Sequence, residues 1–383
     1  MTSHPVLFVD HAPALGGAER SLLLLLEHVD RERWQLHVAG VQGPLLKEAK
    51  LLGVKTHTTR LPRLRRSARF PLDWMQGVRD LVHVVRRTAT VLVVANTVRA
   101  AIFTAPAARL SGVPFIWHMR DFWLSESRPN HESVDRLGKR LLTAAADIVI
   151  TNSAAVAGHL PMTSKINVVY NGIDIDAFRL GIDGEDFRNT HQIPLGAPLV
   201  GMIGRMRPWK GQLRFLEIAR HVRNAAPQAR FVLVGGDPFG VADNYAASVA
   251  ERVEQLGLRE VVAFTGHLED VRPALAAMDL FVHPGEPEPF GLVNVEAMAM
   301  ARPVVAFAHG ALPEIVSDGV TGRLVAPGDR QAMVQAVLDL LNDPPLRSAM
   351  GEAARKRAGA KFSIQRVTAE MDAIFTGVVR ESS

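Results

Sequence analysis

Short apolar segments alternate regularly with helix-like segments along the 383 residues, and this alternation limits the folds that the chain can adopt. The apolar segments are rich in β-branched side chains, so each predicts a strand buried on both faces. Strands of this kind joined by helices are typical of a parallel sheet. The twelve predicted strands lie at 6–10, 36–41, 91–96, 114–119, 147–151, 166–170, 199–204, 230–236, 261–266, 280–284, 303–307 and 322–326.

These strands divide evenly between the two halves of the chain, and one domain usually takes about 100–200 residues. The sequence therefore predicts an α/β protein with two Rossmann-like, doubly wound domains. We expect an N-terminal domain at 1–174, a linker rich in Gly, Asp and Pro at 175–196, and a C-terminal domain at 197–360. The last segment, 361–383, predicts an amphipathic helix. The pattern leaves open whether this helix packs on the C-terminal domain or back on the N-terminal domain.

Composition excludes several classes of protein. The sequence has no cysteine, which excludes disulfides and thiolate metal sites. It has no run of about 18 apolar residues that would span a membrane, and its first residues lack the basic and apolar regions of a secretion signal. We therefore expect a cytoplasmic protein.

Basic residues gather in the stretch 55–87, which holds nine Lys and Arg but two Asp and Glu. Such a stretch is often simply a solvated face of an Arg-rich protein. It also suits an anionic membrane surface, which would place the protein peripherally at the inner face of the plasma membrane, or a phosphate-bearing substrate. A nucleic-acid partner is not expected, because no nucleic-acid motif is present and aromatic residues make up 6% of the chain.

A glycine pair follows the first predicted strand. Gly16 and Gly17, in "DHAPALGGAERS", stand where a helix is expected to begin. Glycines there let backbone N–H groups approach a phosphate or a sugar closely. A tight turn without a ligand explains the same pattern, and both interpretations stay open.

Two cations follow the first strand of the second half. Arg205 and Lys210, in "GRMRPWKGQ", lie at the predicted strand end and at the helix start. A guanidinium fork and a point charge placed there would clamp a diphosphate. Two surface cations at a strand–helix junction are the alternative.

The stretch "EPFGLVNVE" carries the most chemistry. Glu288 lies in a loop that cannot be helical, and Glu296 lies about one turn into the predicted helix that follows. Backbone N–H groups near Gly291, Leu292 and Val293 would point out of the helix N-terminus toward an anion. A carboxylate can accept two hydrogen bonds from a sugar diol. The stretch therefore suits a phosphate together with sugar hydroxyls.

Three other interpretations of the two glutamates compete with this one. An acid/base pair of a glycoside hydrolase is possible in principle, but the helix-start turn and the cations suit phosphate better. A metal site lacks a His or Asp cluster with ligand spacing. Capping or solvated glutamates without a ligand remain the structural alternative.

At this point the motifs resemble a known family, the retaining GT-B glycosyltransferases of glycosyltransferase family four (glycosyl transferases group 1). "EPFGLVNVE" is similar to the family's E-x7-E motif. "GGAERS", "VVYNGID", "GRMRPWKG" and "GALPEIVSDGVTGRLVAPGD" resemble its other ordered motifs, over about 310 residues. The resemblance implies two domains that face a central cleft, with acceptor binding in 1–174 and nucleotide-sugar binding in 197–360.

The resemblance also implies roles for single residues. Arg205 and Lys210 would hold the diphosphate of the donor and stabilise the charge of the leaving group. Glu296 would bind the ribose, and Glu288 would contact the transferred sugar or orient Lys210. Donor contacts are further implied for the following residues: Gly16, Gly17, Phe290, Gly291, Leu292 and Val293.

His118, in "IWHMRD", matches the family's active-site histidine, which adds it to Arg205, Lys210 and Glu288 as a catalytic candidate. A histidine satisfied at a strand end is the alternative. The sequence departs from the family at Ala301, where Gly is usual, and this predicts a different helix cap. "DID" at 174–176 fits an Asp-x-Asp metal motif, but the family generally needs no metal, so neither a metal nor another cofactor is expected.

The function implied by the resemblance is transfer of a hexose from a UDP- or GDP-sugar to an acceptor hydroxyl, with retention of configuration. The expected acceptor is a sugar or a lipid-linked sugar, and the expected setting is bacterial polysaccharide or glycolipid synthesis. Two alternatives stay open. One is another GT-B enzyme, such as a sugar phosphorylase or a nucleotide-sugar epimerase, and the other is a non-catalytic protein that binds sugar nucleotides.

Overall fold

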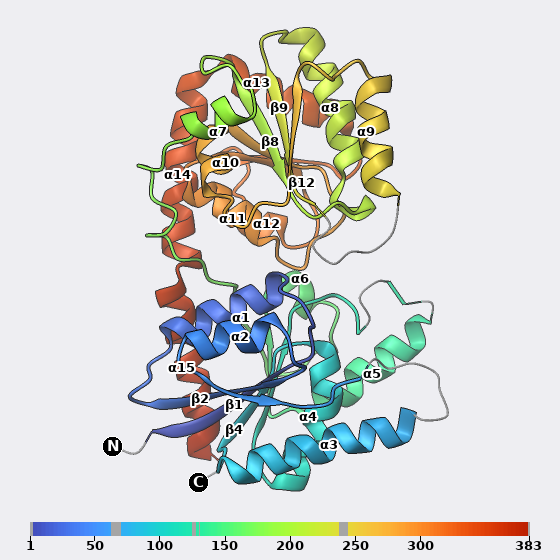
Figure 1. Ribbon diagram of the computed structural model, residues 1–383, viewed down its shortest axis with the longest axis vertical. Helices are drawn as coiled ribbons and strands as arrows, with labels where there is room; N and C mark the ends of the chain where they lie inside the picture. The colour runs from blue at the N-terminus through green and yellow to red at the C-terminus, as the bar shows by residue number, and fades with distance from the viewer. Residues whose placement is uncertain (1–2, 63–69, 125–127, 130, 237–243, 382–383) are drawn as a thin grey trace. The chain divides into compact units, whose positions relative to one another are not determined.

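The computed structural model describes residues 3–62, 70–124, 128–129, 131–236 and 244–381. The chain divides into two compact units, one made of residues 1–172 with 364–383 and the other of residues 173–363. Each unit is a parallel sheet covered by helices (Figure 1). The prediction of an α/β protein with two Rossmann-like parallel-sheet domains is confirmed.

The first unit is built on a seven-stranded sheet with the order β3-β2-β1-β4-β5-β6-β7. Its strands are β1 (His4–Asp10), β2 (Trp34–Gly40), β3 (Lys55–Thr58), β4 (Leu92–Ala95), β5 (Phe115–Met119), β6 (Ile148–Thr151) and β7 (Ile166–Val168). Its helices are α1 (Gly17–His28), α2 (Pro44–Leu51), α3 (Phe70–Arg87), α4 (Val98–Ser111), α5 (Glu132–Ala145), α6 (Ala154–Ala157) and α15 (Ile364–Glu381).

Both faces of this sheet are buried, as the near-continuous apolar strands require. On β1, Val6 and Phe8 belong to one apolar cluster, and Leu7 and Val9 belong to another on the opposite face. All four side chains are at most 1% exposed. The polar groups that end the strands therefore gather at the carboxyl edge of the sheet, where ligands bind in this class of fold.

The C-terminal helix α15 packs on the first unit. Its Phe375 lies edge-on to Phe8 and Trp34, and its Asp372 accepts hydrogen bonds from Arg33 at 2.9 Å and from the indole of Trp34 at 2.6 Å. The amphipathic pattern predicted this helix but left open which domain it covers. Contacts with residues far apart in the sequence decide that question.

The second unit is built on a six-stranded sheet with the order β10-β9-β8-β11-β12-β13. Its strands are β8 (Leu199–Ile203), β9 (Arg230–Val234), β10 (Val262–Gly266), β11 (Leu280–His283), β12 (Val304–Phe307) and β13 (Gly322–Val325). Its helices are α7 (Glu185–Thr190), the short η1 (Pro208–Lys210), α8 (Gln212–Ala225), α9 (Tyr245–Gln255), α10 (Arg272–Ala277), α11 (Leu292–Ala299), α12 (Leu312–Ile315), α13 (Arg330–Asn342) and α14 (Pro344–Phe362).

The twelve predicted strands all occur, and the described residues contain one more, β3. Its sequence is "KTHT", with half-buried or exposed side chains, and it pairs only along β2 at the edge of the sheet. An edge strand needs no apolar run, because one side of it meets solvent. The pattern that reveals buried strands therefore cannot reveal this one.

The stretch 175–196, expected to be a linker, lies in the second unit and contains α7. Arg188 on this helix is buried and donates to the carbonyl oxygen of Ala277 at 2.6 Å and to a carboxylate oxygen of Asp279 at 3.2 Å. Its guanidinium also donates to the carbonyl oxygen of Ala197 at 2.7 Å. These bonds hold the segment against the second sheet.

The prediction of a different cap at Ala301 is wrong. Ala301 adopts a left-handed conformation with φ of 55°, which is the conformation that favours glycine. The N–H of Arg302 bonds back to the carbonyl oxygen of Ala297 at 2.9 Å, as at a helix end of the usual glycine type. The tertiary structure imposes the cap on an alanine at the cost of backbone strain.

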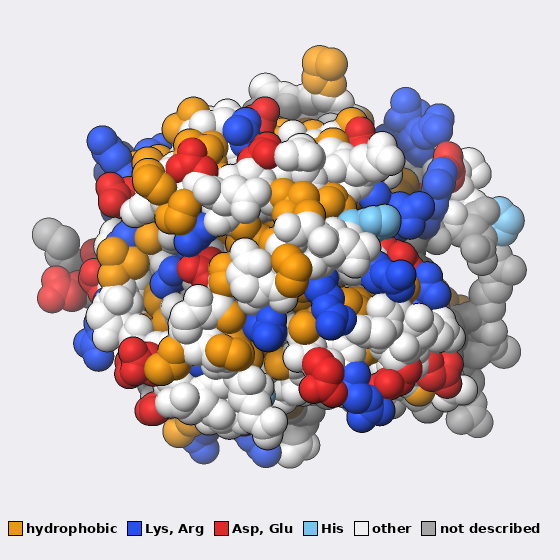
Figure 2. Space-filling view, turned by 90° about the horizontal axis from the view of Figure 1, so that it is seen from above, with side chains coloured by type: hydrophobic (Ala, Val, Ile, Leu, Met, Phe, Trp, Pro, Cys, Tyr) orange, Lys and Arg blue, Asp and Glu red, His pale blue; other side chains and the backbone are white. Residues whose placement is uncertain are grey.

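The predicted basic stretch lies partly outside the described residues, because 63–69 fall there. Among the described residues, no helix is long and apolar enough to cross a membrane. On the face drawn in Figure 2, acidic and basic side chains are interspersed. The surface seen there is therefore mixed in charge.

Candidate functional site

In the second unit, Lys210 and Glu288 form an ion pair between the Nζ atom and Oε1. Lys210 ends the short helix η1, and Gly211, with φ of 87°, turns the chain into α8. Glu288 lies in the loop between β11 and α11 and is 8% exposed. The pair thus joins the loops that follow two adjacent strands, β8 and β11.

Burial alone would raise the pKa of Glu288. The positive charge of Lys210, the hydrogen bond that Lys210 donates and the charge of Arg205 outweigh burial and hold this pKa below its ordinary value. The carboxylate is therefore charged at neutral pH. Arg205 lies two residues beyond the end of β8 and is exposed, and its carbonyl oxygen accepts a hydrogen bond from the side chain of Gln212 at 2.8 Å.

His283, the last residue of β11, lies beneath this pair. Its Nε2 atom is 3.6 Å from Oε1 of Glu288 and has no hydrogen-bond partner among the described residues. Burial lowers the pKa of His283 to about 4, against the opposing effect of the Glu288 charge. The imidazole is therefore neutral beside a charged pair.

The N-terminus of α11 lies next to Glu288. Gly291 precedes the helix with φ of 88°, and its carbonyl oxygen accepts a hydrogen bond from the amide of Asn294 at 3.0 Å. Leu292 and Val293 form the first turn, whose N–H groups have no partner within a helix. Phe290 is buried at 2% exposure and packs edge-on against Phe362. This arrangement suits an anion.

The loop before α11 is held by close backbone contacts. The N–H of Ala311 donates to the carbonyl oxygen of Glu288 at 2.9 Å. A side chain at Gly310 would lie 2.6 Å from that same oxygen, so the close approach requires glycine. Glu296 is the fifth residue of α11 and is half-buried. The structure thus brings the predicted residues of "EPFGLVNVE" together with Lys210 and Arg205 within one unit.

In the first unit, polar side chains from four strand ends form a buried network. The amide of Asn96 donates to Oδ2 of Asp10 at 2.7 Å, and its oxygen accepts from Nε of Arg120 at 2.8 Å. Arg120 also donates to the side-chain oxygen of Asn171. Burial lowers the pKa of Arg120 to about 10, against the charges of Asp10 and Glu19.

The glycine loop is tied to this network through Glu19. The N–H of Gly16 donates to Oε2 of Glu19 at 2.7 Å, which caps α1. Burial, followed by the charge of Asp10, raises the pKa of Glu19 to about 7. Burial also raises the pKa of Asp10. Gly17 is exposed and is the first residue of α1.

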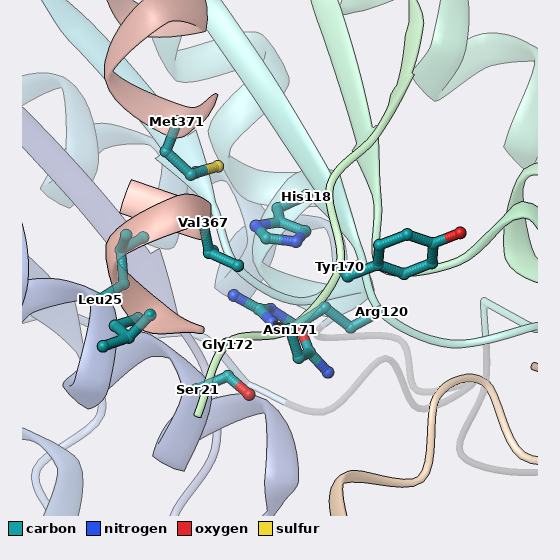
Figure 3. Close-up of a pocket in the computed structure, with 10 residues that line it drawn as sticks. Ser21, Leu25, His118, Arg120, Tyr170, Asn171, Gly172, Val367 and Met371 are labelled. Atoms are coloured by element: carbon teal, nitrogen blue, oxygen red, sulfur yellow. Dashed lines mark hydrogen bonds between the residues drawn. The ribbon is translucent and has the colours of Figure 1, made fainter. Parts of the chain in front are cut away.

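His118 lies on β5 in a cavity of about 10 Å³, a volume that holds about one water molecule. Figure 3 shows Val367 and Met371 projecting from α15 toward it. Its Nε2 atom and the hydroxyl of Ser21, which lines the same cavity, have no hydrogen-bond partner among the described residues. Burial lowers the pKa of His118 well below its ordinary value. Its catalytic role stays a prediction.

The described residues contain no group of three or more His, Asp and Glu side chains that could hold a metal ion. In the "DID" string, Oδ1 of Asp174 accepts backbone hydrogen bonds from Asp176 at 3.0 Å and from Ala177 at 3.3 Å. This carboxylate shapes a turn.

The network of Asp10, Asn96, Arg120 and Asn171 was not predicted from the sequence. Each of these residues ends or closely follows an apolar segment, in "LFVD", "VVAN", "HMR" and "VVYN". His283 likewise ends "LFVH". A polar residue at the carboxyl end of a buried parallel strand was the signal available.

The chain matches two family descriptions. Residues 183–357 match glycosyl transferases group 1, and residues 15–177 match Glycosyltransferase Family 4. A D-inositol 3-phosphate glycosyltransferase of Corynebacterium aurimucosum is 30% identical, over 68% of this chain and 68% of that protein. One from Mycolicibacterium paratuberculosis is 34% identical over 64% of this chain, and the match spans 56% of the relative's length, less than two thirds.

Among solved structures, the Anabaena protein HepE in complex with UDP has a TM-score of 0.85 at 25% identity, with 97% of this chain and 100% of that chain covered. The structure of HepE in complex with UDP-glucose has a TM-score of 0.82. Fold, ordered motifs and sequence identity agree. The chain belongs to glycosyltransferase family four, the glycosyl transferases group 1.

Proposed function

We propose that the protein is a retaining glycosyltransferase that transfers a hexose from a nucleotide diphosphate sugar to an acceptor hydroxyl. The second unit binds the donor, and the first unit binds the acceptor. The observation that carries the proposal is the ion pair of half-buried Lys210 with buried Glu288 beside the N-terminus of α11. A cation beside a helix N-terminus, at the carboxyl edge of a parallel sheet, suits a diphosphate.

In this proposal Lys210 neutralises the diphosphate as it leaves. Its ammonium group has three donors, so Glu288 can hold it in place while the other donors face phosphate oxygens. Arg205, exposed at the end of β8, adds a second cation. Charges that are already in place stabilise the transition state without reorganisation.

Retention of the anomeric configuration specifies which bonds break and form at the anomeric carbon, and on which face. The bond between the anomeric carbon and the β-phosphate oxygen breaks, and a bond from the acceptor oxygen to the same carbon forms on the same face. The acceptor proton passes to the leaving diphosphate. Proton NMR of the first product formed should show the anomeric configuration of the donor, and an inverted product would exclude this route.

UDP-sugars are the first donors to test, because HepE, whose fold spans nearly all of this chain, binds UDP and UDP-glucose. GDP-sugars remain the second class. We propose a sugar or lipid-linked sugar as acceptor, in bacterial polysaccharide or glycolipid synthesis at the inner face of the plasma membrane. The two D-inositol 3-phosphate glycosyltransferases described above, to which this chain is similar, come from bacteria.

The test is calorimetric titration with UDP-glucose, UDP-galactose, UDP-N-acetylglucosamine and GDP-mannose. Wild type is compared with Glu296→Ala and with Glu352→Ala, a matched control on the exposed face of α14 in the same unit. We expect one donor class to bind wild type and the control but not Glu296→Ala. If neither the four donors nor UDP and GDP bind, the proposed function is wrong.

A further inference from the structure

Helix α5 of the first unit turns apolar side chains toward solvent. Val134 is 66% exposed, Leu137 58% and Leu141 62%. Their spacing of three and four residues places them along one face of the helix. A helix on a folded unit normally turns such a stripe toward the core.

The opposite face of α5 is polar and buried. Asp135 and Lys139 form an ion pair at 2.6 Å, and their side chains are at most 5% exposed. The ammonium of Lys139 also donates to the carbonyl oxygen of Phe122 at 2.6 Å, and the N–H of Leu124 donates to Asp135 at 2.8 Å. Rolling the helix to bury the leucines would break this set of bonds. The outward stripe is therefore a fixed property of the fold.

Exposed cations flank the stripe. Arg136 and Arg140 each stand one residue before an exposed leucine. The exposed acidic side chain of the helix, Glu132, is paired with Arg128 at 2.7 Å. The charge left beside the leucines is therefore positive.

We propose that this stripe, defined as Val134, Leu137 and Leu141 with Arg136 and Arg140, docks on a lipid bilayer that carries anionic headgroups. Helices that lie in a membrane interface combine an apolar face with basic residues, and the aliphatic stems of arginine can lie along the apolar layer. Charge complementarity selects an anionic surface, because each Lys or Arg near such a surface strengthens binding.

The stripe is too small for the main alternative, a second copy of the chain. It consists of three apolar side chains on one 14-residue helix, whereas a stable interface buries about 800 Å² on each partner. A bilayer requires less area, because apolar side chains enter it one by one. Membrane docking through α5 does not depend on donor binding, so one experiment can contradict the docking without contradicting the proposed function.

The experiment is co-sedimentation of the full chain with vesicles of phosphatidylcholine mixed with phosphatidylglycerol, and with vesicles of phosphatidylcholine alone. Wild type should bind the mixed vesicles, and binding should weaken as salt is added. The variant Leu137→Glu/Leu141→Glu should bind these vesicles at least about tenfold more weakly than wild type. Arg136→Gln/Arg140→Gln should bind more weakly and with less dependence on salt.

The matched control is Leu51→Glu, which changes a leucine that is 81% exposed on α2 of the same unit. It should bind the mixed vesicles as wild type does. Circular dichroism and thermal unfolding check that each variant is folded. Equal binding by Leu137→Glu/Leu141→Glu and wild type would overturn the proposal. So would a wild-type dimer in sedimentation velocity that this variant dissociates, because the stripe would then be a protein interface.

Discussion

Lys210 and Glu288 stand 78 positions apart in the sequence, and their side chains form an ion pair inside one unit. The pair exists because β8 and β11 are neighbours in the sheet, so the loops that follow these strands meet. His283 lies below it and Arg205 acts on it through its charge. Most of the testable consequences concern this pair and its surroundings.

Removal of either cation should abolish most turnover. Lys210→Ala and Arg205→Ala are each expected to lower kcat by about 10²–10³, because each loses a group that stabilises developing charge. Lys356→Ala, on the exposed face of α14, is the matched control and should keep wild-type kcat. Steady-state kinetics with the donor that the calorimetric titration identifies measure the change in kcat. Near-normal turnover in both variants would contradict the proposed roles.

Substitutions in the ion pair of Lys210 and Glu288 should affect the free energy of unfolding and kcat differently. Lys210→Ala leaves a buried carboxylate without its charged partner, and breaking a buried pair in this way costs about 3–5 kcal/mol. Lys210→Ala/Glu288→Gln should regain most of the free energy of unfolding while kcat stays low. Urea unfolding and kinetics on the same samples test both halves. Recovered turnover in the double variant would show that Lys210 serves only to pair Glu288.

His283 predicts loss of stability in acid. Its pKa is about 4 in the folded chain and near 6.5 when unfolded, so the unfolded chain takes up the proton first. The contribution of neutral His283 to the free energy of unfolding is fully present above pH 6.5 and is lost as the pH falls toward 4. At pH 5 the loss is about 2 kcal/mol. His283→Asn should therefore lose less free energy of unfolding between pH 7 and pH 5 than wild type. An equal loss in both would exclude His283 as the cause.

Glu19 predicts the opposite dependence on pH. Its pKa of about 7 is raised above the unfolded value of 4.5, so the folded chain holds the proton more tightly. Stability from this group is present below pH 4.5 and is lost as the pH rises through 7. Glu19→Gln cannot ionise, yet its amide oxygen can still accept the bond from Gly16. Its free energy of unfolding relative to wild type should rise between pH 5 and pH 8, and a constant difference would refute this.

The left-handed alanine predicts a stabilising substitution. Ala301→Gly removes the strain of φ at 55° and should raise the free energy of unfolding by about 1 kcal/mol. Ala299→Gly, at the last residue of α11, should lower the free energy of unfolding by up to about 1 kcal/mol. Thermal unfolding of both variants and wild type measures these two changes. We expect Ala301→Gly to be more stable than wild type and Ala299→Gly to be less stable.

Turnover should not need a metal ion. Lys210, Arg205 and the N-terminus of α11 supply the positive charge that a divalent cation supplies elsewhere. Activity in the presence of EDTA is therefore expected to equal activity in its absence. A loss of turnover that a divalent ion restores would show that this expectation is wrong.

Much of the fold could be predicted because buried parallel strands leave a direct mark on the sequence. The six apolar segments of the second half correspond to β8 through β13. β3 was missed because an edge strand can be polar. The cap at Ala301 was predicted wrongly because surrounding contacts, and not the local preference of alanine, impose its conformation.

Periodicity and local motifs are encoded over short distances, so the residues alone predicted two parallel α/β units and drew attention to "EPFGLVNVE" and "GRMRPWKG". Three features could be seen only in the folded chain: α15 covers the first unit, Asp10, Asn96, Arg120 and Asn171 share one network, and α5 turns leucines outward. These depend on strand order and on contacts between distant segments. Many packings satisfy the same local pattern, and the free energy of the whole fold selects one of them.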